Sequence, residues 1–520
     1  MIKRNNYSKI YLYGHRSEIH ERFVKNNFTF KKSIQKIEEL IKEGKKDNIV
    51  LSVDIYTGDQ VKNSNYFRLN GILKIAKKFR IKKVQFNLIN PSKDKLIDSL
   101  DVVASYISKA RYVFLFDLII KVEGLPYCLI PEPEGLILKS NNFKDFVKLK
   151  KCKLCAYNQK CNGILKGYLK NLNKSKIKPK LLPREVIIEV THKCNFKCDF
   201  CFNRVSFAKK DRLGKELSSL YIKKIIDNLK KTGVSAVRFT GGEPILRKNI
   251  FSLIKYAKEK GLQVKLNTNG SLIKDYKQVK EIAKYLDYIL FSMHTCNSKE
   301  DEKITGFENS FEKKIRAIKW FRKAGVKIVN VSTVATMENI KNSEKFYKLF
   351  KELKINKWMI NRVIPNPGEK IIWGKKEIPL LIEKLIKIKK DIVRNNYSLK
   401  VHIINAVPFC AYDPIKINAV CAGAKSVDGH ERFVIDPRGF AKPMYYIEKN
   451  IGDPLDINAC WNHSFMKSLR NYNNIPKECK KCAFLEKCKG GDRYSAYFFN
   501  GSYKANDPLM NSSKVKNYIW

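Results

Sequence analysis

The sequence predicts an α/β fold built on a parallel sheet, because strand patterns and helix patterns alternate between residues 181 and 400. Short runs rich in apolar and β-branched residues predict strands at Val186–Val190, Ala236–Thr240, Gln263–Thr268, Tyr288–Ser292, Lys327–Val334 and Lys357–Val363. Amphipathic helix patterns separate these runs. Repeated β–α units imply parallel strands joined by right-handed crossovers, so functional residues are expected at the carboxyl ends of the strands.

The predicted helices are bounded by capping residues and glycines. They cover residues 220–231, 249–260 and 311–324. Ser218 or Ser219 can cap the first helix. Gly261 and Gly325 end the other two, because glycine readily adopts the left-handed backbone that stops a helix.

The composition limits the class of protein. A chain of 520 residues allows about two to four domains, and 44% hydrophobic residues argue against global disorder. Residues 1–6 lack an apolar signal segment, and the most apolar run, 112–122, contains Asp117 and is too short to span a bilayer. Fourteen cysteines favour metal or cluster ligation in a reducing compartment over disulfides. We therefore expect a cytoplasmic protein without membrane association.

The formal net charge of +53, from 103 basic and 50 acidic side chains, has two interpretations. It could reflect an anionic partner such as RNA or an acidic leader peptide. Alternatively, it reflects a lysine-rich composition, with lysines scattered over solvated helix faces. Both interpretations remain open.

Three cysteines follow the first predicted strand with the spacing C-x3-C-x2-C, at Cys194, Cys198 and Cys201. Three thiolates are one fewer than a [4Fe-4S] cube needs. One iron would stay open for another molecule, as in catalytic metal sites generally. A zinc site or unligated thiols would be the alternative.

The second strand ends in a glycine turn, Gly241-Gly242-Glu243-Pro244. A glycine pair lets backbone amides and carbonyls approach a small ligand closely. Polar residues also end later strands: Asn269 the third, and Ser292 and His294 the fourth, with Asn361 and Arg362 as weaker candidates at the sixth. Turn chemistry alone could explain Asn269, and His294 could be a hydrogen-bonded core histidine.

Together these motifs resemble the radical S-adenosylmethionine (radical SAM) superfamily. The resemblance implies a partial (β/α)6 TIM-like barrel in which the three cysteines bind a [4Fe-4S] cluster. The turn from Gly241 to Pro244 would hold the methionine amino group of S-adenosyl-L-methionine (SAM). The other implied cofactor contacts are Phe200, the aromatic residue just before the third cysteine, and Asn269, Ser292 and His294.

The chemistry that the resemblance implies is reductive cleavage of SAM. An electron from a donor such as ferredoxin or flavodoxin would pass through the cluster and yield a 5′-deoxyadenosyl radical. That radical would abstract hydrogen from an unactivated carbon, shielded from side reactions by the barrel. No further residue is assigned as a catalytic acid or base.

Residues 1–180 resemble the back half of the same barrel. Pro126-Tyr127-Cys128 matches Pro408-Phe409-Cys410, and Cys152-x2-Cys155-x5-Cys161 has the spacing of Cys479-x2-Cys482-x5-Cys488. We therefore predict a degenerate half-barrel, without the three-cysteine loop, that ends in a cysteine site of its own. The intact core would cover residues 181–400.

Residues 401–520 resemble the SPASM extension of this superfamily, which holds auxiliary [4Fe-4S] clusters. Met444 and Asp492 stand where that pattern expects cysteine, so two full auxiliary clusters are not expected. One cluster is predicted at Cys479, Cys482 and Cys488. The repeat suggests Cys410 as the fourth ligand, and Cys421 or Cys460 could replace it.

By the same logic Cys128, Cys152, Cys155 and Cys161 form an N-terminal auxiliary site. Four thiolates at this spacing would also suit zinc, in either quartet. Cys296 stands alone and is expected to be a small buried residue.

The predicted function is modification of a peptide or protein by a radical SAM enzyme, giving a cross-link, an epimer or another altered side chain. Modification of RNA is the alternative that the net charge favours. A third possibility is a binding protein whose N-terminal half captures a leader peptide or partner subunit, with catalysis secondary. The intact cysteine loop and glycine turn argue against lost catalysis.

Overall fold

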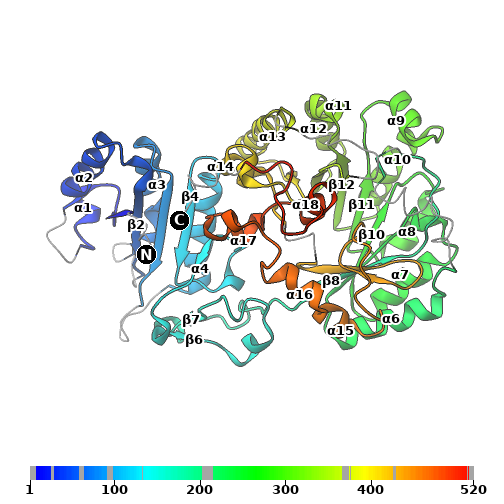
Figure 1. Cartoon of the computed structure of the whole chain (residues 1–520), viewed down its shortest axis with the longest axis horizontal. Helices are drawn as coiled ribbons and strands as arrows, with labels where there is room; N and C mark the ends of the chain where they lie inside the picture. Colours follow the sequence, from blue (N-terminus) through cyan, green and yellow to red (C-terminus); the bar gives the residue numbers. More distant parts are fainter. Residues whose placement is uncertain are drawn as a thin grey trace. The chain divides into compact units, whose positions relative to one another are not determined.

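A computed structural model describes most of the chain. The described residues are 7–24, 29–57, 64–90, 98–131, 133–198, 200–201, 215–365, 374, 376–424, 429–511 and 513. The chain forms two compact units, Met1–Leu181 and Leu182–Ile519. Figure 1 colours the first from blue to cyan and the second from green to red.

The second unit is built on a nine-stranded sheet. Its spatial order is β14-β13-β12-β11-β10-β9-β8-β15-β16, and every neighbouring pair is parallel except β15 and β16. The strands are β8 (Glu185–Glu189), β9 (Ala236–Thr240), β10 (Gln263–Thr268), β11 (Tyr288–Ser292), β12 (Ile328–Val334), β13 (Lys357–Asn361), β14 (Lys400–Ile403), β15 (Arg432–Ile435) and β16 (Ala441–Lys442). The predicted α/β fold with a parallel sheet is confirmed.

Three of these strands were not predicted. β14, β15 and β16 are only two to four residues long, and β14 alternates Lys400 and His402 with two apolar residues. So short a pattern carries little periodic signal. Arg432 to Ile435 nevertheless pair with Glu185 to Ile188, so the region beyond residue 400 adds strands to the sheet of the core.

Helices connect the strands or follow the last of them, and in Figure 1 helices such as α7 and α8 lie outside the sheet. They are α6 (Ser219–Lys231), α7 (Ile250–Glu259), α8 (Tyr276–Ala283), α9 (Ser298–Thr305), α10 (Ser310–Lys323), α11 (Met337–Lys341), α12 (Ser343–Glu352), α13 (Glu377–Arg394), α14 (Pro414–Val420), α15 (Ile457–Asn462), α16 (Ser464–Arg470), α17 (Leu485–Cys488) and α18 (Arg493–Asn500). Of the two predicted caps for α6, Ser218 is used, because its hydroxyl accepts from the Tyr221 amide at 3.1 Å. Gly261 and Gly325, each one residue beyond the end of α7 and α10, have positive φ angles of 78° and 82°.

The first unit contains a five-stranded parallel sheet in chain order. Its elements are β1 (Ser8–Tyr11), α1 (Ser17–His20), α2 (Phe30–Lys42), β2 (Ile49–Ile55), α3 (Leu69–Lys78), β3 (Lys83–Leu88), α4 (Leu100–Val113), β4 (Ile119–Glu123) and β5 (Ile137–Leu138). The strands β11 to β14 of the second unit are also in chain order, and Cys421 then bridges to Ile403 of β14 in parallel. The two sheets therefore share this strand order, and the half-barrel repeat itself stays a prediction.

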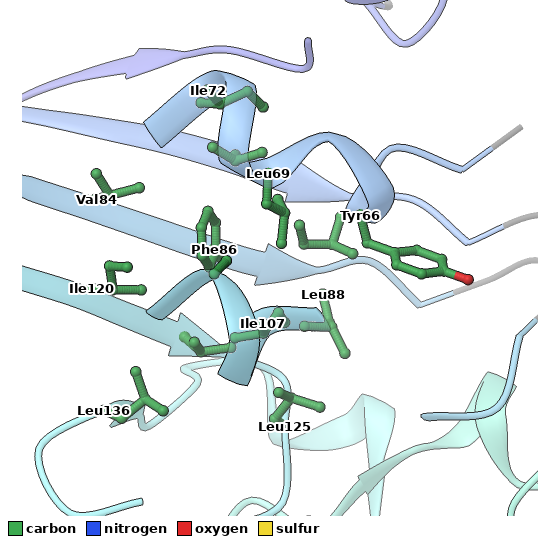
Figure 2. Packing of buried hydrophobic residues seen from close by; sticks show 14 of the residues in the cluster. Tyr66, Leu69, Ile72, Val84, Phe86, Leu88, Ile107, Ile120, Leu125 and Leu136 are labelled. Atoms are coloured by element: carbon green, nitrogen blue, oxygen red, sulfur yellow. The ribbon is translucent and has the colours of Figure 1, made fainter. Parts of the chain in front are cut away.

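The core of the first unit lies between its sheet and its helices. Val84, Phe86 and Leu88 alternate along β3 and point to the same face, where Ile72 of α3 and Ile107 of α4 cover them (Figure 2). All five side chains are at most 7% exposed. The alternation shows why a strand of only six residues holds its register.

Among the described residues, no helix is long and apolar enough to cross a membrane. Cys296, which was expected to be buried, is only half-buried on the segment before α9.

Candidate active site

The cysteine loop leaves the sheet at the carboxyl end of β8. The Val190 amide donates to the Thr240 carbonyl at 2.8 Å, which holds the start of the loop beside β9. Farther along, the Lys197 amide donates to the carbonyl of Thr305, the last residue of α9, also at 2.8 Å. Backbone hydrogen bonds therefore fix the start of the loop and the residue just before its second cysteine.

The structure brings the three predicted cluster ligands together. Loss of water around the thiol raises the pKa of Cys194 to about 11, and Cys201 adds to the effect. Burial raises the pKa of Cys198 to about 12, and both other thiols contribute. Thiols with raised pKa values keep their protons unless a cation takes the protons' place. The three thiols lie together, Cys194 exposed and Cys198 and Cys201 half-buried, and such a group fits a metal cluster.

Among the described residues, no three Cys, His, Asp or Glu side chains converge on the geometry of a single metal ion. A cubane cluster places each of its thiolates on a separate iron. The proximity of the thiols, rather than convergence on one point, is what a cluster requires.

A buried ion pair lies beside the loop. Lys314 of α10 donates to both carboxylate oxygens of Asp301 of α9 at 2.8 Å, and both side chains are completely buried. The Lys314 ammonium also lies 4.8 Å from the centre of the Phe196 ring and lowers the pKa of the Cys198 thiol. No sequence motif pointed to this pair, because its partners lie thirteen residues apart on different helices.

The glycine turn packs directly on the cysteine loop. The Gly242 amide donates to the Thr191 carbonyl at 2.9 Å, and the Glu243 amide to the Lys193 carbonyl at 2.7 Å. A Cβ atom on Gly241 would lie 2.4 Å from the Thr191 oxygen, and one on Gly242 would lie 2.2 Å from the Lys193 oxygen. Only glycine permits this approach of two backbones.

The Glu243 carboxylate joins this turn to the end of β10. It accepts from the Thr268 hydroxyl and the Asn269 amide, each at 2.7 Å, and from the Ile245 amide at 3.1 Å. Burial raises the pKa of Glu243 to about 7, even though these donors oppose the shift. With three donors already bound, the carboxylate orients the residues around it. Pro244 begins the short 3-10 helix that follows.

Asn269 also contacts the cysteine loop. Its Nδ2 donates to Asn195 Oδ1 at 2.9 Å, while its Oδ1 accepts from the Ser271 amide at 2.9 Å. It therefore combines the turn role, which was one of its two predicted roles, with a bridge to the loop.

His294 and Phe200 lie against each other, edge to face, with ring centres 4.7 Å apart. The Nδ1 atom of His294 accepts from the Val334 amide at 3.2 Å. Burial lowers the pKa of His294 to about 3, and Lys314 adds to the shift, so its ring is neutral at physiological pH. Ser292 ends β11, in register with Ser332 of β12.

Asn361 and Arg362, the weaker candidates at the end of β13, hydrogen bond to other side chains of the protein. Asn361 donates to the hydroxyl of Ser332. Arg362 forms a buried double hydrogen bond with Asp507, at 2.7 and 3.1 Å. That pair ties β13 to the end of the chain.

Glu216 is a residue of this site that sequence reasoning missed. Its carboxylate accepts from the Thr191 hydroxyl at 2.6 Å and from the His192 amide at 3.1 Å. It thereby orders the residues that lead into the cysteine loop. It lies 25 residues from Thr191 in the sequence, and no local pattern marks it.

Comparison with known proteins identifies the family. Residues 188–350 match the domain family described as the radical SAM superfamily. The chain is 30% identical over 233 residues to the probable GTP 3′,8-cyclase of Saccharolobus solfataricus, a match covering 44% of this chain and 73% of that protein. The PqqA peptide cyclase of Bradyrhizobium diazoefficiens is 26% identical over 338 residues, or 62% of this chain and 84% of that protein. The chain belongs to the radical SAM superfamily.

A solved structure agrees with the fold of this radical SAM protein. Streptococcus suis SuiB bound to S-adenosylmethionine has a TM-score of 0.51 and 19% identity, covering 63% of this chain and 77% of that one. The superfamily uses a [4Fe-4S] cluster and SAM. Together these groups supply reductive cleavage of SAM to a 5′-deoxyadenosyl radical.

A second thiol group lies in the extension of this radical SAM protein. Burial raises the pKa of Cys410 to about 11 and that of Cys479 to about 12, and Cys482 adds to both shifts. Burial also raises the pKa of Cys488, with contributions from the other three thiols. Cys410, Cys479, Cys482 and Cys488 are therefore close neighbours.

The two alternative fourth ligands have other partners. The Cys421 thiol donates to the Asn405 carbonyl at 3.7 Å, and the Cys460 thiol donates to the Asp453 carbonyl at 3.1 Å. A thiol that donates a hydrogen bond carries its proton, whereas a metal ligand has lost it. Cys410 is the alternative that joins the trio.

Met444 and Asp492, which stand where cysteines were expected, have other roles in the fold: one packs in an apolar cluster and the other caps a helix. Met444 is 6% exposed and packs in an apolar cluster with Ala406, Ala424 and Ile447. Asp492 caps α18, accepting from the Tyr494 amide at 3.1 Å and the Ser495 hydroxyl at 2.6 Å.

Proposed function

We propose that this protein is a radical SAM enzyme that modifies a peptide or protein by abstracting a hydrogen atom. The observation that carries the proposal is the contact between the glycine turn and the cysteine loop. It brings an amide-rich turn next to three thiols at the carboxyl ends of neighbouring parallel strands. Ligand sites in such folds lie at this edge.

In this proposal Cys194, Cys198 and Cys201 hold the [4Fe-4S] cluster. The turn from Gly241 to Pro244, supported by Asn269, holds the methionine part of SAM. Phe200, Ser292 and His294 contact the rest of the cofactor. Glu243 keeps the two strand ends together, and the neutral His294 ring, whose Nδ1 accepts from the Val334 amide, carries its proton on Nε2.

The auxiliary site is proposed to hold one [4Fe-4S] cluster on Cys410, Cys479, Cys482 and Cys488, with zinc as the alternative metal. We propose three domains, residues 1–180, 181–400 and 401–520. The cluster chemistry and the fourteen cysteines, none of which is in a disulfide, suit the reducing cytoplasm. The electron donor would be a small redox protein such as ferredoxin or flavodoxin.

A peptide substrate is favoured by the similarity to the PqqA peptide cyclase. That match spans 338 residues, or 62% of the chain. The match to the superfamily domain is shorter and covers only positions 188–350. RNA remains the competing substrate class, on the basis of the +53 net charge.

The test begins with anaerobic reconstitution of the full chain. SAM and a reductant are added, and 5′-deoxyadenosine is measured beside a variant with Cys194, Cys198 and Cys201 all changed to Ala. Release by the wild type alone is expected. Release by neither protein would reject the radical assignment.

The substrate class is tested separately. Any short open reading frame beside the gene is co-expressed with the wild type or with the triple variant, and the peptide is examined by mass spectrometry. A mass change that requires the three cysteines supports the proposal. An unchanged peptide, together with RNA binding that weakens steeply with added salt, would favour RNA instead.

A further inference from the structure

The N-terminal unit contains a thiol group that the proposed reaction does not use. Cys128, Cys152, Cys155 and Cys161 are all unpaired and half-buried. Tyr127, directly before Cys128, stacks on Tyr157, with ring centres 4.6 Å apart. Tyr157 lies between Cys155 and Cys161, and its carbonyl accepts from the Cys161 amide at 2.7 Å. These contacts hold Cys128 beside the loop that carries the other three cysteines.

The first of these thiols lies on a short turn that matches the turn of Cys410. Tyr127–Leu129 and Phe409–Ala411 are both 3-10 turns that follow an extended proline. The third residue of each turn donates its amide to that proline's carbonyl, at 3.2 Å for Leu129 and 2.9 Å for Ala411.

The C-x2-C pairs match as well. Lys150–Leu154 and Lys477–Lys481 are five-residue 3-10 segments that contain Cys152 and Cys479. In both, the amide of the second cysteine donates to the carbonyl of the first, at 3.0 Å. The same spacing in the sequence thus gives the same backbone in both units.

The amide that faces the last thiol is also shared. The Phe409 amide donates to the sulfur of Cys488 at 3.4 Å, and the Tyr127 amide makes the equivalent hydrogen bond to Cys161. Phe409 and Tyr127 occupy the same position, directly before the first cysteine of each set. Amide hydrogen bonds to sulfur are among the features that tune cluster thiolates.

Backbone groups of Lys178 and Lys180 contact two of the N-terminal thiols. The Lys180 amide donates to Cys155 Sγ at 3.4 Å, and the backbone of Lys178 hydrogen bonds to Cys128. In the extension, the backbone of Asn511 does the same for Cys410. A buried thiolate is costly unless a cation compensates its charge, so a site whose sulfurs accept from several backbone amides suits a bound metal centre.

We propose that Cys128, Cys152, Cys155 and Cys161 hold a [4Fe-4S] cluster of their own in the N-terminal unit. The cluster is complete in its protein ligands, unlike that of the three-cysteine loop, and offers no open iron. Its role is to fix the turn after β4 and the β6–β7 hairpin (Phe146–Val147 and Ile164–Leu165), which carry its ligands. The proposal is independent of the substrate that the enzyme modifies.

The test counts metals in the full chain after anaerobic purification and reconstitution. A Cys152→Ala/Cys155→Ala variant is compared with wild type and with a Cys296→Ala control. The double variant is expected to lose about four irons and four sulfides per chain, and the control none. It should still release 5′-deoxyadenosine, because the radical site keeps its three cysteines.

Two outcomes would overturn the proposal. Unchanged iron in the double variant would mean that these thiols bind no cluster. Loss of about one zinc in place of the irons would make the site a zinc site.

A measurement on the wild type covers the case in which the double variant does not fold. The reconstituted protein is alkylated under anaerobic conditions, and labelled cysteines are located by mass spectrometry. Protection of all four thiols, lost when the iron is oxidatively removed, is expected. Labelling of these thiols in the iron-loaded protein would also reject the proposal.

Discussion

The Nδ2 group of Asn87 donates a hydrogen bond to the hydroxyl of Ser52 over 2.9 Å. Asn361 makes the same bond to Ser332 in the other unit. In both cases the asparagine lies near the carboxyl end of one strand and the serine on the neighbouring strand, β3 with β2 and β13 with β12. The two sheets therefore share a polar contact as well as a strand order, which composition alone would not produce.

The glycine turn gives the most direct test of the site. We expect Gly242→Ala to lower SAM cleavage about a hundredfold, the scale on which a shift of about 1 Å acts on catalysis. A Cβ atom there would lie 2.2 Å from the Lys193 oxygen and would push the turn off the cysteine loop. Release of 5′-deoxyadenosine and the iron content are measured together.

The matched control is Gly325→Ala, which has a positive φ of 82° but no atom within 4 Å of the added carbon. It should cost about 1–2 kcal/mol of stability from backbone strain and leave cleavage unchanged. Equal cleavage by both variants would contradict the steric argument.

A buried carboxylate in the sheet supports a prediction about pH. Burial opposes ionisation of Glu185, but Arg238, Arg432 and Lys265 outweigh it and hold the pKa of Glu185 well below its usual value. Arg238 donates to it at 2.7 and 3.3 Å. We expect Glu185→Gln to destabilise the apoprotein by about 3–5 kcal/mol at pH 7, because three cations lose their buried partner.

The sign of the pH effect follows from the lowered pKa. The stabilisation by Glu185 is fully present above the pKa of the unfolded chain, about 4.3, and is lost as the pH falls through the lower folded value. The difference between wild type and Glu185→Gln in urea unfolding should therefore shrink below about pH 4. A constant difference from pH 7 to pH 3 would contradict this assignment.

The buried pair of Asp301 and Lys314 should be sensitive to the loss of one partner. Asp301→Asn is expected to cost about 3–5 kcal/mol, because the ammonium of Lys314 stays buried without a carboxylate. Changing both residues, Asp301→Asn with Lys314→Met, should restore much of the stability, since no uncompensated charge then remains. Urea midpoints of Asp301→Asn, Lys314→Met, the double variant and the wild type form the cycle.

An exposed pair gives the comparison. Glu344 and Lys387 lie 2.8 Å apart with side chains 58% and 76% exposed, and Glu344→Gln should leave the midpoint unchanged. If Asp301→Asn is equally harmless, the pair beside the cysteine loop has no structural role.

The choice of the fourth auxiliary ligand can be decided by metal counting. Cys410→Ala should remove about four irons from the reconstituted protein. Cys421→Ala and Cys460→Ala should remove none, because these thiols donate to backbone carbonyls. Iron loss in either of the latter, with full iron in Cys410→Ala, would transfer the role to that residue.

Much of the core followed from local patterns. Five of the six predicted strands in residues 181–400 agree with the structure to within one residue at each end, and the sixth, predicted to reach Val363, ends at Asn361. The cysteine loop and glycine turn were found because their spacing is contained in short segments. Glu216 and the Asp301–Lys314 pair were not found, because each acts on the loop from a distant element that no sequence spacing reveals.

The sequence by itself determined the strands of the core, the cysteine spacings and the two matching quartets, since these depend on residues close together in the chain. Only the tertiary structure decided that β15 pairs with β8, that Cys410 joins Cys479, Cys482 and Cys488, and that Glu243 ties the glycine turn to β10. The reason is physical. The partner of a buried thiol or carboxylate is the group that the packing of distant segments places within hydrogen-bond distance. No local sequence pattern predicts that packing.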